Sequence, residues 1–243
     1  MLSSSSATQP VVNIALFDLD HTLLPIDSDY AWGEFTTAIG WTDPVVFKQR
    51  NDEFFAHYKK GELNIADYVR FATAAIKQQG AINSIAAHAD FMSAVIRPAI
   101  KKPALDLVEK HRAAGDQLLI VTATNEFVTR PIADVFGIAD LIAVQLERDE
   151  TPGGTGWITG EIKGVPSAHE GKVTRVEQWL AMQNLSWEQA NITFYTDSIN
   201  DIALLEKVNL PVATNPDARL RAVALERGWR ILELFASVVT DNT

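Results

Sequence analysis

Short apolar runs that stop abruptly at polar residues limit this chain to few possible folds. The runs are rich in β-branched residues, and runs of this kind are typical of buried parallel strands whose ends open into polar loops. Helical patterns separate them along the chain, and such an alternation predicts an α/β fold with a doubly wound parallel sheet. The strongest runs are residues 11–17, 117–122 and 191–195, and weaker ones are residues 141–144 and 210–213.

One long segment interrupts the alternation. Residues 28–100 contain no convincing strand but several amphipathic helical patterns, such as residues 44–59 and 65–78. The segment is too long for a single crossover helix, so it predicts an inserted α-helical cap. The predicted α/β core then comprises residues 11–27 and 101–243. Within it, residues 145–165 alternate around a Pro-Gly-Gly sequence, which predicts a small β-hairpin flap.

The composition excludes several classes of protein. The net charge of −10 argues against a broad contact with nucleic acid or anionic lipid. The chain has no Cys, which excludes disulfides and thiolate chemistry. No apolar run approaches the length of about 18 residues that spans a membrane. Residues 1–10 are rich in Ser and are expected to form a disordered tail, not a signal peptide. We expect a cytoplasmic protein, and the sequence makes no prediction about its oligomeric state.

Acidic residues follow the strands at the edge where doubly wound sheets bind their ligands. Asp18 and Asp20 follow the first run, and Asp197 and Asp201 follow the run at residues 191–195. Four converging carboxylates repel one another, and a hard divalent cation relieves that repulsion. Mg²⁺ accepts one or two carboxylates together with water and phosphate oxygens. The cluster therefore predicts a Mg²⁺ site, with Lys172 as a further positive charge.

The same residues can hydrolyse a small phosphate ester. Asp18 can attack phosphorus and form an aspartyl-phosphate. Asp20 can protonate the leaving oxygen and later accept a proton from water. Thr122 can donate its hydroxyl to a phosphoryl oxygen, and Lys172 can neutralise charge. The histidines show no ligand spacing, which argues against a zinc site.

These residues lie in four motifs: DLDHT (residues 18–22), the threonine of IVTATN (Thr122), the lysine of HEGKV (Lys172) and DSIND (residues 197–201). The motifs resemble those of the haloacid dehalogenase superfamily of phosphatases, in its phosphoserine-phosphatase-like branch. The resemblance covers nearly everything from Asn13 to Leu234. It implies that Asp18 is the nucleophile and Asp20 the acid/base. It also implies that Asp18, Asp20 (through its main-chain carbonyl) and Asp197 bind Mg²⁺, supported by Asn200 and Asp201.

The resemblance also bears on the substrate. Phosphoserine phosphatases of this branch carry Glu nine residues after the nucleophile, where this chain has Asp27. They also need an arginine for the substrate carboxylate, and only Arg50 or Arg70 can be nominated. The sequences DSDYAWGEF, TATNEFVT and DSIND resemble a subset associated with histidinol-phosphate hydrolysis. Histidinol phosphate has an ammonium group but no carboxylate, so it is the favoured substrate. The residues assigned to substrate binding are Asp27, Tyr30, Thr22, Asn125 and Arg70.

Several alternatives stay open at this point. Phosphoserine is the second candidate substrate. Asp18, Asp20, Thr122 and Asn125 can also serve as helix N-caps. A non-catalytic module that binds a phosphorylated ligand is a different class of function, although such proteins usually lose the nucleophile or the last motif's aspartates. A phosphotransferase differs only in the acceptor that the cap admits.

Overall fold

The computed structural model describes residues 11–235. The predicted tail at residues 1–10 and the last part of the predicted core, residues 236–243, lie outside the described residues. The strands are β1 (Val12–Phe17), β2 (Gln117–Asn125), β3 (Asp140–Val144), β4 (Leu146–Arg148), β5 (Ile158–Ile162), β6 (Ala190–Thr196), β7 (Leu210–Thr214) and β8 (Arg230–Leu232). The helices are α1 (Ser28–Ala38), α2 (Pro44–Lys60), α3 (Ile65–Phe91), α4 (Arg97–Ala99), α5 (Lys102–Ala114), α6 (Glu126–Val135), α7 (Glu170–Met182), α8 (Ile202–Lys207) and α9 (Ala218–Arg227).

The main sheet is parallel and has the order β3-β2-β1-β6-β7-β8. The predicted doubly wound α/β fold is therefore confirmed. The chain builds one half of the sheet from β1 to β3 and then crosses over to begin the other half with β6. The order of the strands thus reverses beside β1, and ligands of such sheets bind at the carboxyl ends there. Phe17 pairs with Ile120 of β2 and with Tyr195 of β6, so these strands end side by side.

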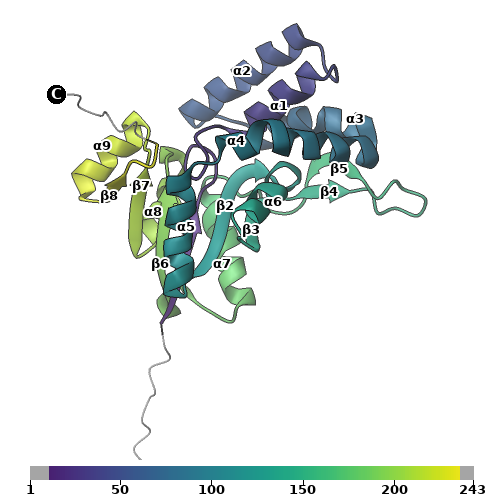
Figure 1. Cartoon of the computed structure of the whole chain (residues 1–243). Helices are drawn as coiled ribbons and strands as arrows, with labels where there is room; N and C mark the ends of the chain where they lie inside the picture. The colour runs from purple at the N-terminus through teal and green to yellow at the C-terminus, as the bar shows by residue number, and fades with distance from the viewer. Residues whose placement is uncertain (1–10, 236–243) are drawn as a thin grey trace, which may run out of the picture.

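Alternate residues of β1 build the cores on the two faces of the sheet. Ala15 and Phe17 belong to the core that also contains buried residues of α5 and α6. Ile14 and Leu16 belong to the core that contains buried residues of α7, α8 and α9. Figure 1 shows α5 crossing in front of the sheet. The loop after β1 therefore begins at a strand that is buried on both faces.

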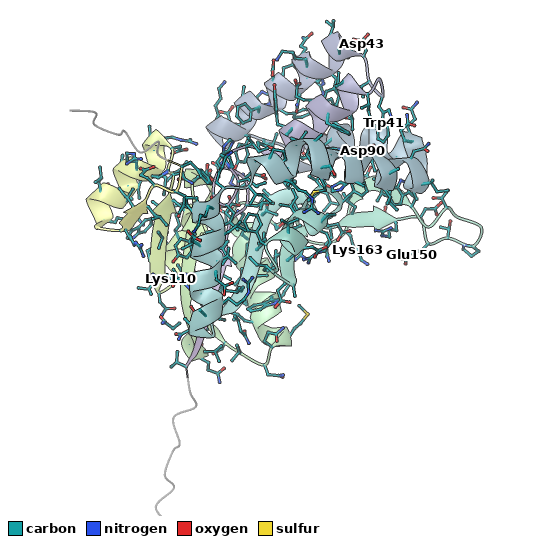
Figure 2. The ribbon with its side chains drawn as sticks, viewed as in Figure 1. Trp41, Asp43, Asp90, Lys110, Glu150 and Lys163 are labelled. Carbon is teal, nitrogen blue, oxygen red and sulfur yellow. The ribbon has the colours of Figure 1, made fainter. Side chains whose placement is uncertain are left out.

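The helices α1, α2 and α3 form the inserted cap over the carboxyl edge of the sheet (Figure 1). Asp27, Asp43 and Asn64 cap the amino ends of these helices with their side chains. Asp43 lies at the end of the cap remote from the sheet (Figure 2). Gly80 interrupts α3 with a φ of 73° and a ψ of 176°. Beyond this break α3 continues through a π-helical turn into α4.

The predicted flap is present as the antiparallel hairpin β4–β5. It packs against the cap, because Trp157 Nε1 donates a 3.0 Å hydrogen bond to the carbonyl of Ile76 in α3.

The division of the chain into core and cap at residues 28 and 100 stays a prediction. Within residues 11–235 no helix combines the length and apolar character needed to cross a membrane.

Candidate active site

The residue after β1 forms one end of a buried ionic bridge. Lys172, in the first turn of α7, donates to Asp18 Oδ1 at 2.8 Å and to Asp201 Oδ2 at 2.7 Å. Only 2% of Lys172 is exposed to solvent. Thr196, the last residue of β6, also donates to Asp201 Oδ2, at 2.7 Å. Three elements that follow different strands therefore meet at Asp18, as the sequence predicts.

A threonine joins the Asp18 carboxylate to that of Asp197. The Thr22 hydroxyl lies 3.2 Å from Asp18 Oδ2 and 3.4 Å from Asp197 Oδ1. The same hydroxyl accepts a 3.0 Å hydrogen bond from the main-chain N–H of Asp197. Thr22 is completely buried, so it fixes the loop after β1 against the loop after β6.

Asp20 is held by donors from the cap and from β2. Its Oδ1 accepts from the main-chain N–H of Ser28 at 2.7 Å, and its Oδ2 accepts from the Thr124 hydroxyl at 2.8 Å. The main-chain N–H of Thr124 in turn donates to Thr122 Oγ1 at 3.1 Å. The Thr122 hydroxyl is therefore positioned as an acceptor from Thr124 and keeps its own proton available for donation.

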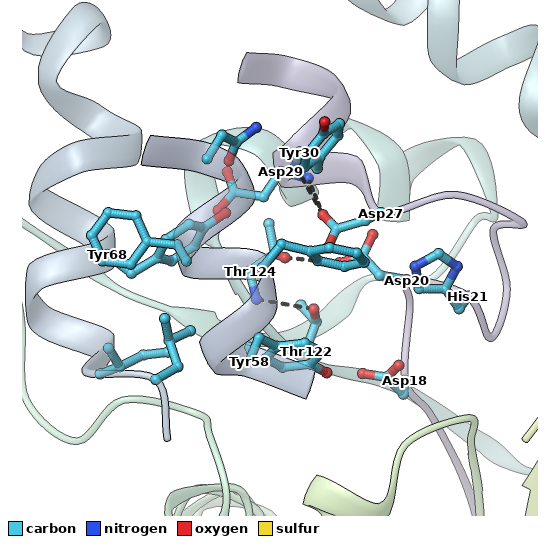
Figure 3. Close-up of a pocket in the computed structure, with 16 residues that line it drawn as sticks. Asp18, Asp20, His21, Asp27, Asp29, Tyr30, Tyr58, Tyr68, Thr122 and Thr124 are labelled. Carbon is cyan, nitrogen blue, oxygen red and sulfur yellow. Dashed lines mark hydrogen bonds between the residues drawn. The ribbon is translucent and has the colours of Figure 1, made fainter. Parts of the chain in front are cut away.

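A cavity separates these core loops from the cap (Figure 3). Asp18, Asp20, Thr122 and Thr124 line it from the core. Asp27, Asp29 and several aromatic rings line it from the other side, among them Tyr30, Tyr58 and Tyr68. All lining residues belong to the described part of the chain, and none of them is Lys or Arg. The cavity is consequently acidic and partly aromatic.

Burial and mutual repulsion raise the pKa values of these carboxyl groups. Burial raises the pKa of Asp18 to about 6, against the lowering effect of Lys172. Burial and the nearby charge of Asp27 raise the pKa of Asp20 to about 6 as well. Burial, Asp18 and Asp201 together raise the pKa of Asp197 well above its usual value. Burial works to lower the pKa of Lys172, but Asp18 and Asp201 outweigh it and raise the pKa.

The donor set fits a divalent cation with oxygen ligands. Asp18 and Asp197 approach the same hydroxyl, and the single ammonium of Lys172 does not balance them together with Asp20 and Asp201. Within residues 11–235 no three Asp, Glu or His side chains gather closely enough to hold an ion by themselves. Mg²⁺ does not need three, because it keeps several waters and binds through one or two carboxylates plus phosphate. The carboxylates of Asp18 and Asp197, which approach one hydroxyl, are such a pair.

Comparison with known families identifies the family of proteins to which this site belongs. The sequence model of the haloacid dehalogenase-like hydrolases matches residues 15–206, which include Asp18, Lys172 and Asp201. The chain belongs to this family. It is a phosphatase of the haloacid dehalogenase superfamily. Phosphatases of this superfamily typically use Mg²⁺ and an aspartyl intermediate.

Several relatives resemble this chain over most of its length. A histidinol-phosphatase of Neisseria meningitidis serogroup C is 39% identical over 221 residues, which are 90% of this chain and 98% of the relative. A phosphoserine phosphatase of Mycobacterium tuberculosis is 28% identical, over 94% of this chain and 74% of the relative. The crystal structure of a Bordetella pertussis protein of unknown function is 44% identical with a TM-score of 0.86, covering 93% of this chain and all of the other.

A more distant structure shares only the fold. A substrate-bound phosphoserine phosphatase has a TM-score of 0.63 at 15% identity, covering 91% of this chain and 92% of its own. The haloacid dehalogenase fold thus extends over nearly the whole described chain.

The structure brings most of the predicted site residues of this phosphatase together. Asp18, Asp20, Thr122, Asp27 and Tyr30 line the cavity. Thr22, Lys172, Asp197 and Asp201 surround Asp18 through the contacts given above. Asn200 instead donates to the main-chain carbonyl of Tyr58 in the cap at 3.0 Å.

Other predicted residues lie away from the cavity. Arg70 is exposed on α3 and pairs with Glu161 of the flap at 2.9 Å and with Asp67 at 2.9 Å. The alternative Arg50 is exposed on α2 and pairs with Glu53. Asn125 does not line the cavity: its Oδ1 caps α6, and its Nδ2 donates to Asp29 at 3.1 Å. Among the side chains that the structure describes, the cavity lining therefore includes no cation for a substrate carboxylate.

Sequence reasoning missed several residues of the site. Asp29 and Tyr68 line the cavity and hydrogen-bond to each other. Thr124 holds Asp20, and the Ser167 hydroxyl donates to the main-chain carbonyl of Thr122 at 2.6 Å. A sequence feature could have identified Asp29, because it lies two residues after Asp27 in an acidic stretch. Nothing in the sequence pattern distinguished Ser167 or Tyr68.

Gly171, which directly precedes Lys172, leaves no room for a side chain. A Cβ at Gly171 would lie 2.0 Å from the carbonyl oxygen of Pro166, so Gly171→Ala must displace the loop that also carries Ser167. We predict a loss of roughly 1–3 kcal/mol in unfolding free energy. Phosphatase activity should fall at least about tenfold, because Lys172 moves. Denaturant unfolding and steady-state kinetics measure both effects. The exposed Gln178→Ala on the same helix is the control, and wild-type behaviour of Gly171→Ala would contradict the prediction.

Asp29 makes the stability of the fold depend on pH. Burial, with the nearby charge of Asp27, raises the pKa of Asp29 from 3.8 to about 7. Its stabilising contribution is therefore fully present below about pH 4 and is lost as the pH rises through about 7. We predict that the Tm of Asp29→Asn, relative to that of the wild type at the same pH, rises by at least about 2 °C when the pH is raised from 5 to 8. The control is the exposed Asp67→Asn. If the difference in Tm between Asp29→Asn and the wild type were the same at pH 5 and at pH 8, the raised pKa of Asp29 would be contradicted.

Proposed function

We propose that this phosphatase hydrolyses histidinol phosphate through an aspartyl-phosphate on Asp18, with Mg²⁺ as cofactor. The observation that carries the substrate is the composition of the cavity. Its described lining residues offer Asp20, Asp27 and Asp29 to a leaving group, and none of them is Lys or Arg. A cationic leaving group without a carboxylate fits this charge distribution. The histidinol-phosphatase from Neisseria meningitidis, at 39% identity, supports the same substrate.

Asp18 acts as the nucleophile in this proposal. Lys172 holds one of its oxygens and Thr22 the other, so the carboxylate has a fixed direction. One oxygen attacks phosphorus while the bond from phosphorus to the leaving alcohol oxygen breaks. The product of this step is an aspartyl-phosphate and the alcohol. Bound Mg²⁺ would neutralise charge on the phosphoryl oxygens, with Asp18, Asp197 and the Asp20 carbonyl as its protein ligands.

Asp20 transfers the protons. Its raised pKa lets it hold a proton nearer to neutral pH, and it gives this proton to the departing alcohol oxygen. It then takes a proton from the water that attacks phosphorus, which releases inorganic phosphate and restores Asp18. Ser28 and Thr124 keep Asp20 in place during both steps. Thr122 donates its hydroxyl to a phosphoryl oxygen.

Asp27 recognises the ammonium group in this proposal. Its Oδ1 is occupied by the main-chain N–H groups of Asp29 and Tyr30, at 3.0 and 2.8 Å. These bonds leave its other oxygen available toward the cavity that it lines. Asp27 therefore has a fixed orientation and one oxygen for a cationic substrate group.

A panel of phosphate esters tests the substrate. We predict that kcat/KM for histidinol phosphate exceeds that for phosphoserine at least about a hundredfold, because the phosphoserine carboxylate would enter an acidic cavity unpaired. Sugar phosphates should also be poor substrates. Asp18→Asn is the blank that reports contaminating phosphatase activity. Equal or better hydrolysis of phosphoserine would contradict the proposed substrate while leaving the phosphatase class intact.

A further inference from the structure

The cavity contains a buried polar side chain with an unsatisfied hydrogen-bond donor. Asn51 of α2 is 3% exposed and lines the cavity, and its Nδ2 has no hydrogen-bond partner among the described residues. A buried amide N–H without a partner is costly, so native proteins rarely keep one without a reason. A Cβ at Gly33 would come within 3.3 Å of this Nδ2, so α1 packs closely against the amide and restricts its movement. Asn51 is thus a fixed donor in a space that admits a ligand.

Asp29 lines the same cavity and supplies acceptors. It is 6% exposed, and its carboxylate accepts from Asn125 Nδ2 at 3.1 Å and from the Tyr68 hydroxyl. A carboxylate has about four lone-pair positions, so two further donors can be accommodated. The two known partners fix the orientation of Asp29 without exhausting its capacity.

Aromatic rings complete this part of the cavity. Tyr30 and Phe55 both line it, with ring centroids 5.8 Å apart, and Phe54 and Tyr68 line it as well. Rings of this kind favour a flat, partly apolar group over a flexible or strongly hydrated one. The cavity therefore combines a donor, an acceptor and aromatic surfaces.

We propose that Asp29 and Asn51 form a subsite for the nitrogen heterocycle of the leaving group, separate from the ammonium position at Asp27. A neutral imidazole has one N–H donor and one nitrogen acceptor. The ring N–H donates to Asp29, and the other ring nitrogen accepts from Asn51 Nδ2. This subsite rests on the proposed function, and it adds specificity residues that the histidinol-phosphate hypothesis does not itself require.

Inhibition by two product analogues tests the subsite. Histidinol and phenylalaninol both carry the amino alcohol, but only histidinol has ring nitrogens. We expect wild type to bind histidinol at least about tenfold more tightly than phenylalaninol, measured as inhibition constants against p-nitrophenyl phosphate. In Asn51→Leu and Asp29→Asn this preference should fall severalfold or more. Asn83→Ala, on the exposed side of α3, is the control and should keep the wild-type preference.

The outcomes separate the subsite from the function on which it rests. Undiminished preference for histidinol in folded Asn51→Leu and Asp29→Asn would overturn the subsite, even if histidinol phosphate remained the best ester of the panel. A wild-type enzyme that prefers phosphoserine would overturn the proposed substrate, and the subsite with it. Circular dichroism establishes that each variant is folded. If Asp29→Asn does not fold, Asn51→Leu alone decides, because Asn51 Nδ2 makes no hydrogen bond with the described residues that the substitution could remove.

Discussion

The bridge from Lys172 to Asp18 and Asp201 is the interaction on which the site depends. All three groups are buried, and removing one partner of such a bridge typically costs about 3–5 kcal/mol, since a charge is left unpaired. The bridge also joins the loop after β1 to α7 and to the segment after β6. The fold supplies this meeting point because the strand order reverses beside β1. The same contacts therefore hold the loops together and aim the Asp18 carboxylate.

The cap determines what the same chemistry acts on. Its helices contribute Asp29, Asn51 and most of the aromatic rings, while the core contributes Asp18, Asp20 and Thr122. The arginines of the cap that could have met a carboxylate pair with Glu161 and Glu53 at the surface. Arg70 thereby connects the cap to the flap. Under the proposed function, the charge of the cavity selects the substrate, and the bridge from Lys172 to Asp18 and Asp201 does not distinguish one phosphate ester from another.

The sequence predicts the fold and which polar residues gather at the strand ends. Strand ends carry their polar residues to one edge of a parallel sheet, so Asp18, Thr122 and Asp197 could be grouped without coordinates. The residues of the cap could not be grouped in this way. Strand pairing places strand ends beside one another, but nothing comparable in the sequence sets which face of an inserted helix meets the core. Only its charge points to Arg70, and nothing in the sequence indicates that Asn51 Nδ2 is buried without a hydrogen-bond partner among the described residues. These assignments depend on tertiary packing.

Chemical trapping of the intermediate tests the central claim that Asp18 bonds to phosphorus. An enzyme turning over histidinol phosphate with Mg²⁺ is quenched in acid and treated with borohydride, which reduces an aspartyl-phosphate to homoserine. Peptide mass spectrometry then locates the modified residue. The account predicts homoserine at position 18, with none when substrate is omitted. Homoserine at another aspartate, or none at all during sustained turnover, would contradict it.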